Sequence, residues 1–96
     1  MDAEPDPPVA RNFEIRGRMQ GVGFRHQVRG AAVSCGLAGW ARNGAGGSVE
    51  VHVQGSPDQL ARFRSMISGD SNYAERLLIK ESDAQVEPCA GFESRQ

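Results

Sequence analysis

The segment from Gly17 to Arg25 carries the residues best suited to chemistry in this chain of 96 residues. It reads Gly-Arg-Met-Gln-Gly-Val-Gly-Phe-Arg, and we expect it to join a strand to the start of a helix. Gly21 and Gly23 allow successive backbone N–H groups to turn toward one point, where the helix dipole adds positive charge. Arg25 falls in the first helical turn and can add a bidentate guanidinium. The pattern therefore predicts a site for a small oxyanion or phosphate.

This loop differs from two common phosphate-binding motifs. A Walker A loop needs a lysine, which this segment lacks, and a dinucleotide-binding fingerprint needs a third glycine where His26 stands. A plain tight turn, with Arg25 exposed to solvent, stays an alternative on this segment alone.

Positive charge is concentrated around the loop although the whole chain is close to neutral. The formal net charge is −1, from 11 basic and 12 acidic residues, so no general affinity for nucleic acid is expected. Residues 11–42, however, hold six arginines against the single acid Glu14. This block can attract a small anion or simply be a solvated surface, and the sequence leaves the roles of Arg18 and Arg42 open.

No segment is typical of a membrane protein or an exported one. No apolar run approaches the roughly 20 residues that span a bilayer. The N-terminus is acidic and rich in proline, unlike a signal peptide. We therefore expect a cytoplasmic protein with no membrane partner.

The cysteines and histidines form no local metal motif. Cys35 and Cys89 lie 54 positions apart, without a CxxC pair or a neighbouring histidine. His26 and His52 are too distant to be a local pair, so each is expected to be a surface or strand residue. We expect no metal site and two reduced thiols, with a single disulfide between them left open.

Periodicity predicts the elements that position the loop. Phe13–Arg16 alternates as a half-buried strand, and apolar residues recur at helical spacing from Phe24 to Cys35. Ser56 and Gln59 form a capping box at the start of a second helix, which Gly69 ends. Further strands are expected over 37–43, 49–54, 77–79 and 91–94, with a glycine-rich hairpin turn over 44–47.

The order of these elements predicts an α+β fold of the ferredoxin-like type. The order β-α-β-β-α-β gives an antiparallel sheet with both helices on one face, and an extra strand follows at the C-terminus. Residues 1–10 are expected to be a disordered, acidic, proline-rich tail, which leaves one domain over 11–96. This fold hosts many functions, so the function must come from a site.

Two glycine-containing segments together resemble the paired signatures of the acylphosphatase family. The first, Gly-x-Val-Gln-Gly-Val-x-Phe-Arg, matches 17–25, with Met19 replacing the usual valine. The second, Gly-Trp-x-x-Asn-x-x-x-Gly-x-Val, matches 39–49. The resemblance extends from Phe13 to Phe92, and after Gly69 the strand pattern carries it rather than a motif.

The resemblance implies hydrolysis of the carboxyl–phosphate bond of an acyl phosphate to a carboxylate and inorganic phosphate. By this resemblance Arg25 binds the phosphoryl oxygens and Asn43 orients the attacking water. The backbone N–H groups that would bind the phosphoryl oxygens belong to Gln20, Gly21, Val22, Gly23, Phe24 and Arg25. The family uses no metal or other cofactor and forms no phosphoenzyme. The expected partners are a small acyl phosphate and inorganic phosphate, the latter as product and competitive inhibitor, and the expected state is a monomer.

Two other functions remain to be tested. One is a non-catalytic or carbamoyl-phosphate-handling anion-binding module, since a related domain begins the large hydrogenase-maturation carbamoyltransferases. The chain ends at Gln96 without the further domains of those proteins, which disfavours this function. The other is a ferredoxin-like nucleic-acid binder, but Val49, Val51 and Val53 of the clearest strand offer no aromatic stacking surface.

Overall fold

The computed structural model describes residues 7–16, 22–69 and 78–95 and confirms the predicted α+β fold. Its elements are β1 Val9–Arg16, α1 Val22–Ser34, β2 Ala38–Asn43, the 3-10 turn η1 Ala45–Gly47, β3 Val49–Gly55, α2 Pro57–Gly69, β4 Leu78–Ala84 and β5 Phe92–Arg95. The β-α-β-β-α-β order with an additional C-terminal strand is the one that the periodicity predicts.

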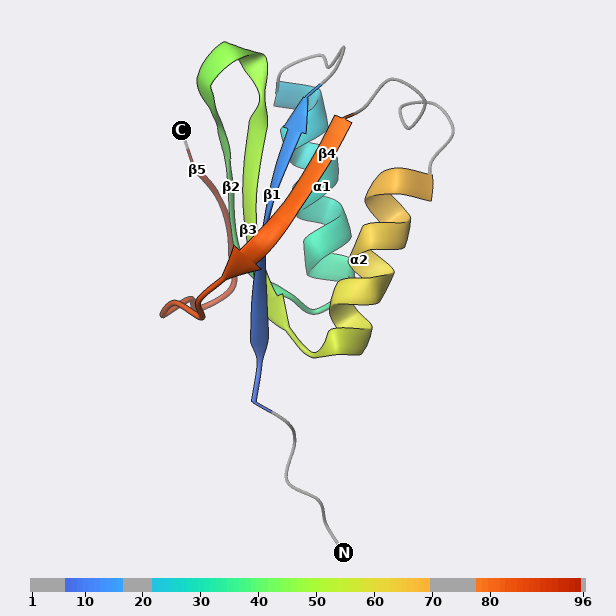
Figure 1. Cartoon of the computed structure of the whole chain (residues 1–96), viewed down its shortest axis with the longest axis vertical. Coiled ribbons are helices and arrows are strands. Elements are labelled where there is room, and N and C mark those ends of the chain that lie inside the picture. Colours follow the sequence, from blue (N-terminus) through green and yellow to red (C-terminus); the bar gives the residue numbers. More distant parts are fainter. Residues whose placement is uncertain (1–6, 17–21, 70–77, 96) are drawn as a thin grey trace, which may run out of the picture.

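Five strands form one twisted sheet in the order β4-β1-β3-β2-β5, and both helices lie on one of its faces (Figure 1). The pairs β1–β3, β1–β4 and β2–β3 are antiparallel, as expected, whereas the additional strand β5 runs parallel to β2. The first helix packs on β2 and β5, and the second packs on β3. The opposite face of the sheet is free of described helices.

The core lies between the sheet and the helices. Alternate residues of β1 and β3 point into it, because successive side chains of a strand face opposite sides of the sheet. Phe13 of β1 meets Phe63 of α2 edge to face, with ring centroids 5.5 Å apart. The buried apolar residues that form this core include Ile15, Phe24, Val28, Ala32, Leu37, Val49, Val51, Val53 and Leu60.

The N-terminal boundary of the domain differs from the expectation. Val9 already pairs with Gly55 in β1, and Ala10 is buried, so these two residues of the expected tail belong to the sheet. Strand β1 begins before the alternation of apolar and polar residues that starts at Phe13. It does so because β3 offers backbone hydrogen-bond partners to the residues that precede Phe13. Residues 1–6 of the expected tail lie outside the described residues.

Strand β4 is also longer than the sequence predicts. The expected strand covers 77–79, of which residue 77 lies outside the described residues, whereas the observed one continues to Ala84. Four of the five added residues, Lys80 to Asp83, are polar and poor strand formers, so the sequence pattern misses this half of the strand. They are held by pairing with β1 at the edge of the sheet.

The ends of the helices follow their predicted signals. The hydroxyl of Ser56 accepts the Gln59 N–H at 3.2 Å, while the Gln59 side chain accepts the Ser56 N–H at 2.8 Å. This is the predicted capping box at the start of α2. Gly36, with φ of 74°, follows the last turn of α1 in the left-handed conformation that favours glycine.

Candidate active site

Arg25 lies in the first turn of α1, at the end of the molecule where β1 ends and the β2–β3 turn lies (Figure 1). Its guanidinium reaches the C-terminal strand, because Nη1 donates to the carbonyl oxygen of Arg95 at 3.3 Å. Its Nε is buried and has no hydrogen-bond acceptor among the described residues. A buried donor without an acceptor costs about 1–3 kcal/mol, so this atom favours the arrival of an anion.

Among the described residues, no carboxylate pairs with the guanidinium of Arg25. Three other arginines at strand ends do pair with a carboxylate: Arg16 with Glu14 at 3.0 Å, Arg42 with Glu50 at 2.9 Å and Arg95 with Glu93 at 3.3 Å. Much of the charge near this end of the sheet is thus neutralised locally, and Arg25 is the described arginine best placed there to bind an anion.

Asn43 is the last residue of β2 and pairs with Val49 of β3. Its side chain is exposed, and no described residue forms a hydrogen bond with its amide. The turn that follows is closed by the Gly44 N–H, which donates to the Ser48 carbonyl oxygen at 2.8 Å. The turn therefore holds the backbone of Asn43 while leaving its amide available to a ligand or a water molecule.

The predicted N–H groups of 20–25 fall partly within the described chain. Gln20 and Gly21 lie outside the described residues, whereas 22–25 form the first turn of α1. The N–H groups of a first turn face the end of the helix, where the helix dipole is positive. Phe24 anchors this turn, since its side chain is buried in the core.

The contact between Arg25 and Arg95 has no signal in the sequence. The acceptor is a backbone carbonyl, which every residue carries, and it comes from a strand 70 positions away along the chain. Only the parallel pairing of β5 with β2 brings it beside α1.

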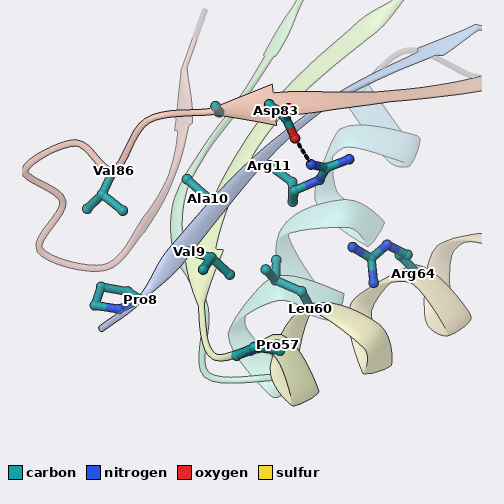
Figure 2. A pocket seen from close by; sticks show the side chains of 10 residues that line it. Pro8, Val9, Ala10, Arg11, Pro57, Leu60, Arg64, Asp83 and Val86 are labelled. Carbon is teal, nitrogen blue, oxygen red and sulfur yellow. Dashed lines mark hydrogen bonds and ion pairs between the residues drawn. The ribbon is translucent and has the colours of Figure 1, made fainter. Parts of the chain in front are cut away.

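A separate hollow of about 540 Å³ lies where β1 and α2 begin and β4 ends (Figure 2). Its floor is apolar, with Ala10 and Leu60, and its charged groups already have partners. Arg11 pairs with Asp83, as Figure 2 shows, and Arg64 pairs with Glu81. Among its described lining residues, the hollow therefore offers no unpaired charge to a phosphate, and it lies apart from Arg25.

Glu81, beside that hollow, joins two arginines from different elements. Arg64 of α2 binds it through two nitrogens, each at 2.8 Å, and Arg11 of β1 binds it at 2.6 Å. These hydrogen bonds, with Arg64 contributing most, hold the pKa of the Glu81 carboxyl below its ordinary value. The ion pairs connect both layers of the fold.

Comparison with known proteins assigns the family. The acylphosphatase family model matches residues 11–94. An acylphosphatase from Solibacter usitatus is 37% identical over 89 residues, which cover 93% of each chain. The chain belongs to the acylphosphatase family. It is accordingly a hydrolase with the ferredoxin-like fold of that family.

Solved structures agree with this acylphosphatase assignment. The acylphosphatase of Coxiella burnetii matches with a TM-score of 0.78 and 27% identity, covering 92% of this chain and 93% of that one. Full-length HypF in its phosphate- and nucleotide-bound form matches with a TM-score of 0.86 at 24% identity, covering 99% of this chain but 13% of HypF. The second match is a likeness of fold. Neither described helix is long and apolar enough to cross a membrane.

Proposed function

We propose that this acylphosphatase hydrolyses acyl phosphates by direct attack of water on a phosphoryl group bound by Arg25 and the N–H groups of 20–25. The observation that supports this most is the guanidinium of Arg25, which has one buried N–H without an acceptor and no carboxylate partner among the described residues. A phosphoryl dianion supplies both an acceptor and the opposite charge.

The reaction needs charge neutralisation and positioning more than covalent help from the protein. The water oxygen forms a bond to phosphorus, the bond from phosphorus to the carboxyl oxygen breaks, and its electron pair leaves with the carboxylate. A carboxylate is a good leaving group, so no strong general acid is required. Arg25 and the N–H groups stabilise the charge on the equatorial oxygens.

Asn43 orients the attacking water in this proposal. Its amide can donate and accept hydrogen bonds but cannot take up a proton at neutral pH. An oxygen of the bound phosphoryl group therefore accepts the proton of the water. The exposed amide at the end of β2 supports this role, because it is free of hydrogen bonds to described residues.

The remaining properties follow from a site that recognises mainly the phosphoryl group. Inorganic phosphate, the product, is expected to compete with the substrate for Arg25. The enzyme is expected to act as a monomer, and its free cysteines, Cys35 and Cys89, fit the reducing cytoplasm.

Turnover of benzoyl phosphate in the presence of EDTA tests the proposed activity. We expect release of phosphate at a rate that is unchanged by the chelator and competitively inhibited by added phosphate. If the protein binds inorganic phosphate but does not hydrolyse benzoyl phosphate, it is instead the non-catalytic anion-binding module considered above. Carbamoyl phosphate, assayed in parallel, shows whether that compound is preferred.

A further inference from the structure

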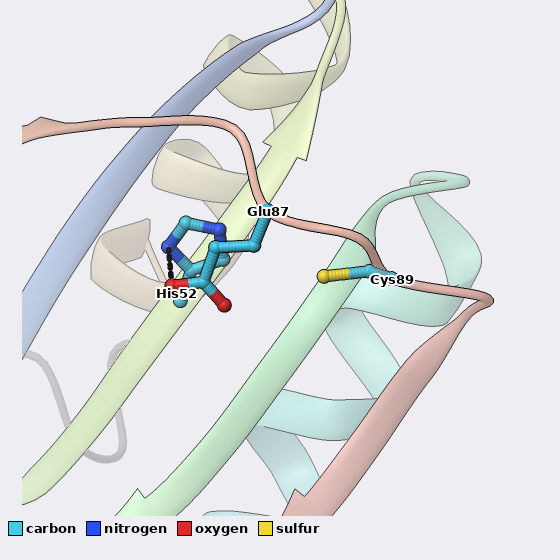
Figure 3. Close-up of side chains that lie close together, drawn as sticks. All are labelled: His52, Glu87 and Cys89. Atoms are coloured by element: carbon cyan, nitrogen blue, oxygen red, sulfur yellow. Dashed lines mark ion pairs between the residues drawn. The ribbon is translucent and has the colours of Figure 1, made fainter.

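Three potential metal ligands meet on the face of the sheet that carries no described helix (Figure 3). His52 comes from the middle of β3, whereas Glu87 and Cys89 belong to the segment between β4 and β5. One ligand atom of each residue lies within 4.8 Å of the others. His52, expected at the surface or in a strand, is a strand residue that is only 1% exposed. The sequence pattern misses this group because its members are up to 37 positions apart.

Gln54 fixes which nitrogen of His52 carries the proton. The Gln54 side chain donates through Nε2 to the Glu87 carbonyl oxygen at 2.7 Å and accepts the Glu87 N–H through Oε1 at 2.9 Å. This pair of bonds sets the orientation of the amide. The same Oε1 lies 2.8 Å from His52 Nε2, which must therefore be the donor. In the neutral ring the lone pair then belongs to Nδ1.

That lone pair lies beside the Glu87 carboxylate. His52 Nδ1 is 3.9 Å from Glu87 Oε2, while the other oxygen, Oε1, accepts the indole N–H of Trp40 at 3.1 Å. The Trp40 ring also stacks on the imidazole, with centroids 5.8 Å apart. These contacts orient both side chains, and the atoms that they turn toward each other are His52 Nδ1 and Glu87 Oε2. Protein metal sites use this arrangement to fix the tautomer and the direction of their ligands.

Cys89 supplies the third atom. Its thiol is half-buried, and burial together with the nearby Glu87 raises its pKa. A cysteine binds a divalent cation as its thiolate, so binding of a cation at this site would release a proton.

We propose that His52 Nδ1, Glu87 Oε2 and Cys89 Sγ bind a zinc ion. Zinc accepts nitrogen, oxygen and sulfur ligands together, whereas magnesium and calcium prefer oxygen alone. Zinc–ligand bonds place their ligand atoms about 3.5 Å apart, so the three atoms must approach by roughly 1 Å. The side chain of Glu87 is 44% exposed on an irregular segment, which lets it make this movement.

Asn12 contacts His52 at the same site when no metal is bound. Its Oδ1 lies 2.8 Å from His52 Nδ1. The oxygen and nitrogen of an amide are assigned from the hydrogen-bond network, and a half-turn of the Asn12 amide brings Nδ2 to the same place, where it donates to the lone pair of Nδ1 when no metal is bound. The zinc ion would displace this amide, and water would complete a tetrahedral coordination. The site is separate from Arg25 and takes no part in the proposed hydrolysis.

Titration of the untagged, reduced chain with cobalt(II) tests the proposal. Cobalt(II) binds to the same ligands as zinc and, unlike zinc, has absorption bands that identify them. We expect one cobalt per chain, a near-ultraviolet thiolate-to-cobalt absorption band, quenching of Trp40, the only tryptophan, and displacement by one equivalent of zinc. Cys89→Ala should abolish the band, and Glu87→Gln should weaken zinc binding about tenfold or more.

Two matched control variants show whether a loss of zinc affinity comes from the proposed ligands or from any loss of a thiol or a carboxylate. Cys35→Ala changes the other thiol, which is buried in the core, and Glu93→Gln changes an exposed carboxylate on β5. Both should retain wild-type zinc affinity. Circular dichroism without metal identifies variants that remain folded. The proposal is overturned if the wild type shows no thiolate band, or if folded Cys89→Ala or Glu87→Gln binds zinc as the wild type does.

Discussion

Asn43 and Arg25 divide the proposed chemistry between positioning and charge. In the proposed mechanism the guanidinium binds substrate and product alike, because both carry the phosphoryl group. The amide of Asn43 is required only when a water molecule must be directed at phosphorus. Substitutions of these two residues should therefore differ in their kinetic signatures.

Asn43→Ala should lower kcat by about 100-fold, because the attacking water loses its orienting group. The inhibition constant of phosphate should stay within about twofold of wild type, since Arg25 is intact. Steady-state kinetics with benzoyl phosphate, with and without phosphate, measure both values. A large loss of phosphate affinity would place Asn43 in phosphate binding instead.

His26 provides a test of the proton acceptor. It is exposed on α1, next to Arg25, and is the titratable side chain closest to it in sequence. The proposed mechanism makes an oxygen of the phosphoryl group the proton acceptor, so His26→Gln should leave both kcat and the pH–rate profile between about pH 6 and pH 8 essentially unchanged. A transition near neutrality that disappears in this variant would identify His26 as a general base.

At the scale of the elements, local sequence signals determine where the helices begin and end. The capping box of Ser56 and Gln59 satisfies two N–H groups at the start of α2. Ser56→Ala should lower the free energy of unfolding by about 1 kcal/mol without changing turnover, because α2 lies apart from Arg25. Urea denaturation measures the loss. Ser65→Ala, at an exposed position of the same helix, is the control and should change stability by less than about 0.5 kcal/mol.

Gly39 shows a constraint that pairing of strands imposes on one residue. Its φ of 142° brings its backbone so close to β3 that an added Cβ would lie 1.8 Å from the His52 carbonyl oxygen. Gly39→Ala should therefore shift β2 or unfold the chain, with a loss of about 3 kcal/mol or more. Gly30→Ala, where nothing lies within 4 Å of the added carbon, should be neutral or stabilising. Thermal melts of the two variants compare them directly, and similar melting temperatures would contradict this account.

Elements with local signals are predictable from the sequence, whereas those that depend on pairing are not. The alternation of Val49, Val51 and Val53 is enough to identify β3, and the two glycine-containing signatures are enough to single out Arg25 and Asn43. The polar half of β4 and the first residues of β1 are strands only because a neighbour pairs with them. The contacts of Arg25 with β5, and of His52 with Glu87, depend on how distant segments meet on the sheet.

For the whole molecule, Glu81 links β4 to β1 and α2 through Arg11 and Arg64. Because the folded state lowers the pKa of this carboxyl, its contribution is complete above the pKa of the unfolded chain and is lost as pH falls through the folded value. Glu81→Gln should lower stability by about 1 kcal/mol near pH 7 and by progressively less toward about pH 3.

Urea denaturation at several pH values measures this difference. Asp83→Asn is the matched control, because the Asp83 side chain is 97% exposed and should contribute less than about 0.5 kcal/mol. If the difference in free energy of unfolding between Glu81→Gln and wild type does not decrease at low pH, the Glu81 carboxyl does not stabilise the fold through its charge.

Binding of the transferred phosphoryl group by the guanidinium of Arg25 is central to the proposed mechanism. Hydrolysis of benzoyl phosphate in EDTA by Arg25→Gln and by Arg29→Gln, an exposed arginine one turn further along α1, tests it most directly. We predict that Arg25→Gln loses about 1000-fold or more in kcat/KM together with competitive inhibition by phosphate, while Arg29→Gln stays within about twofold of wild type. Near-normal turnover by Arg25→Gln would contradict the mechanism.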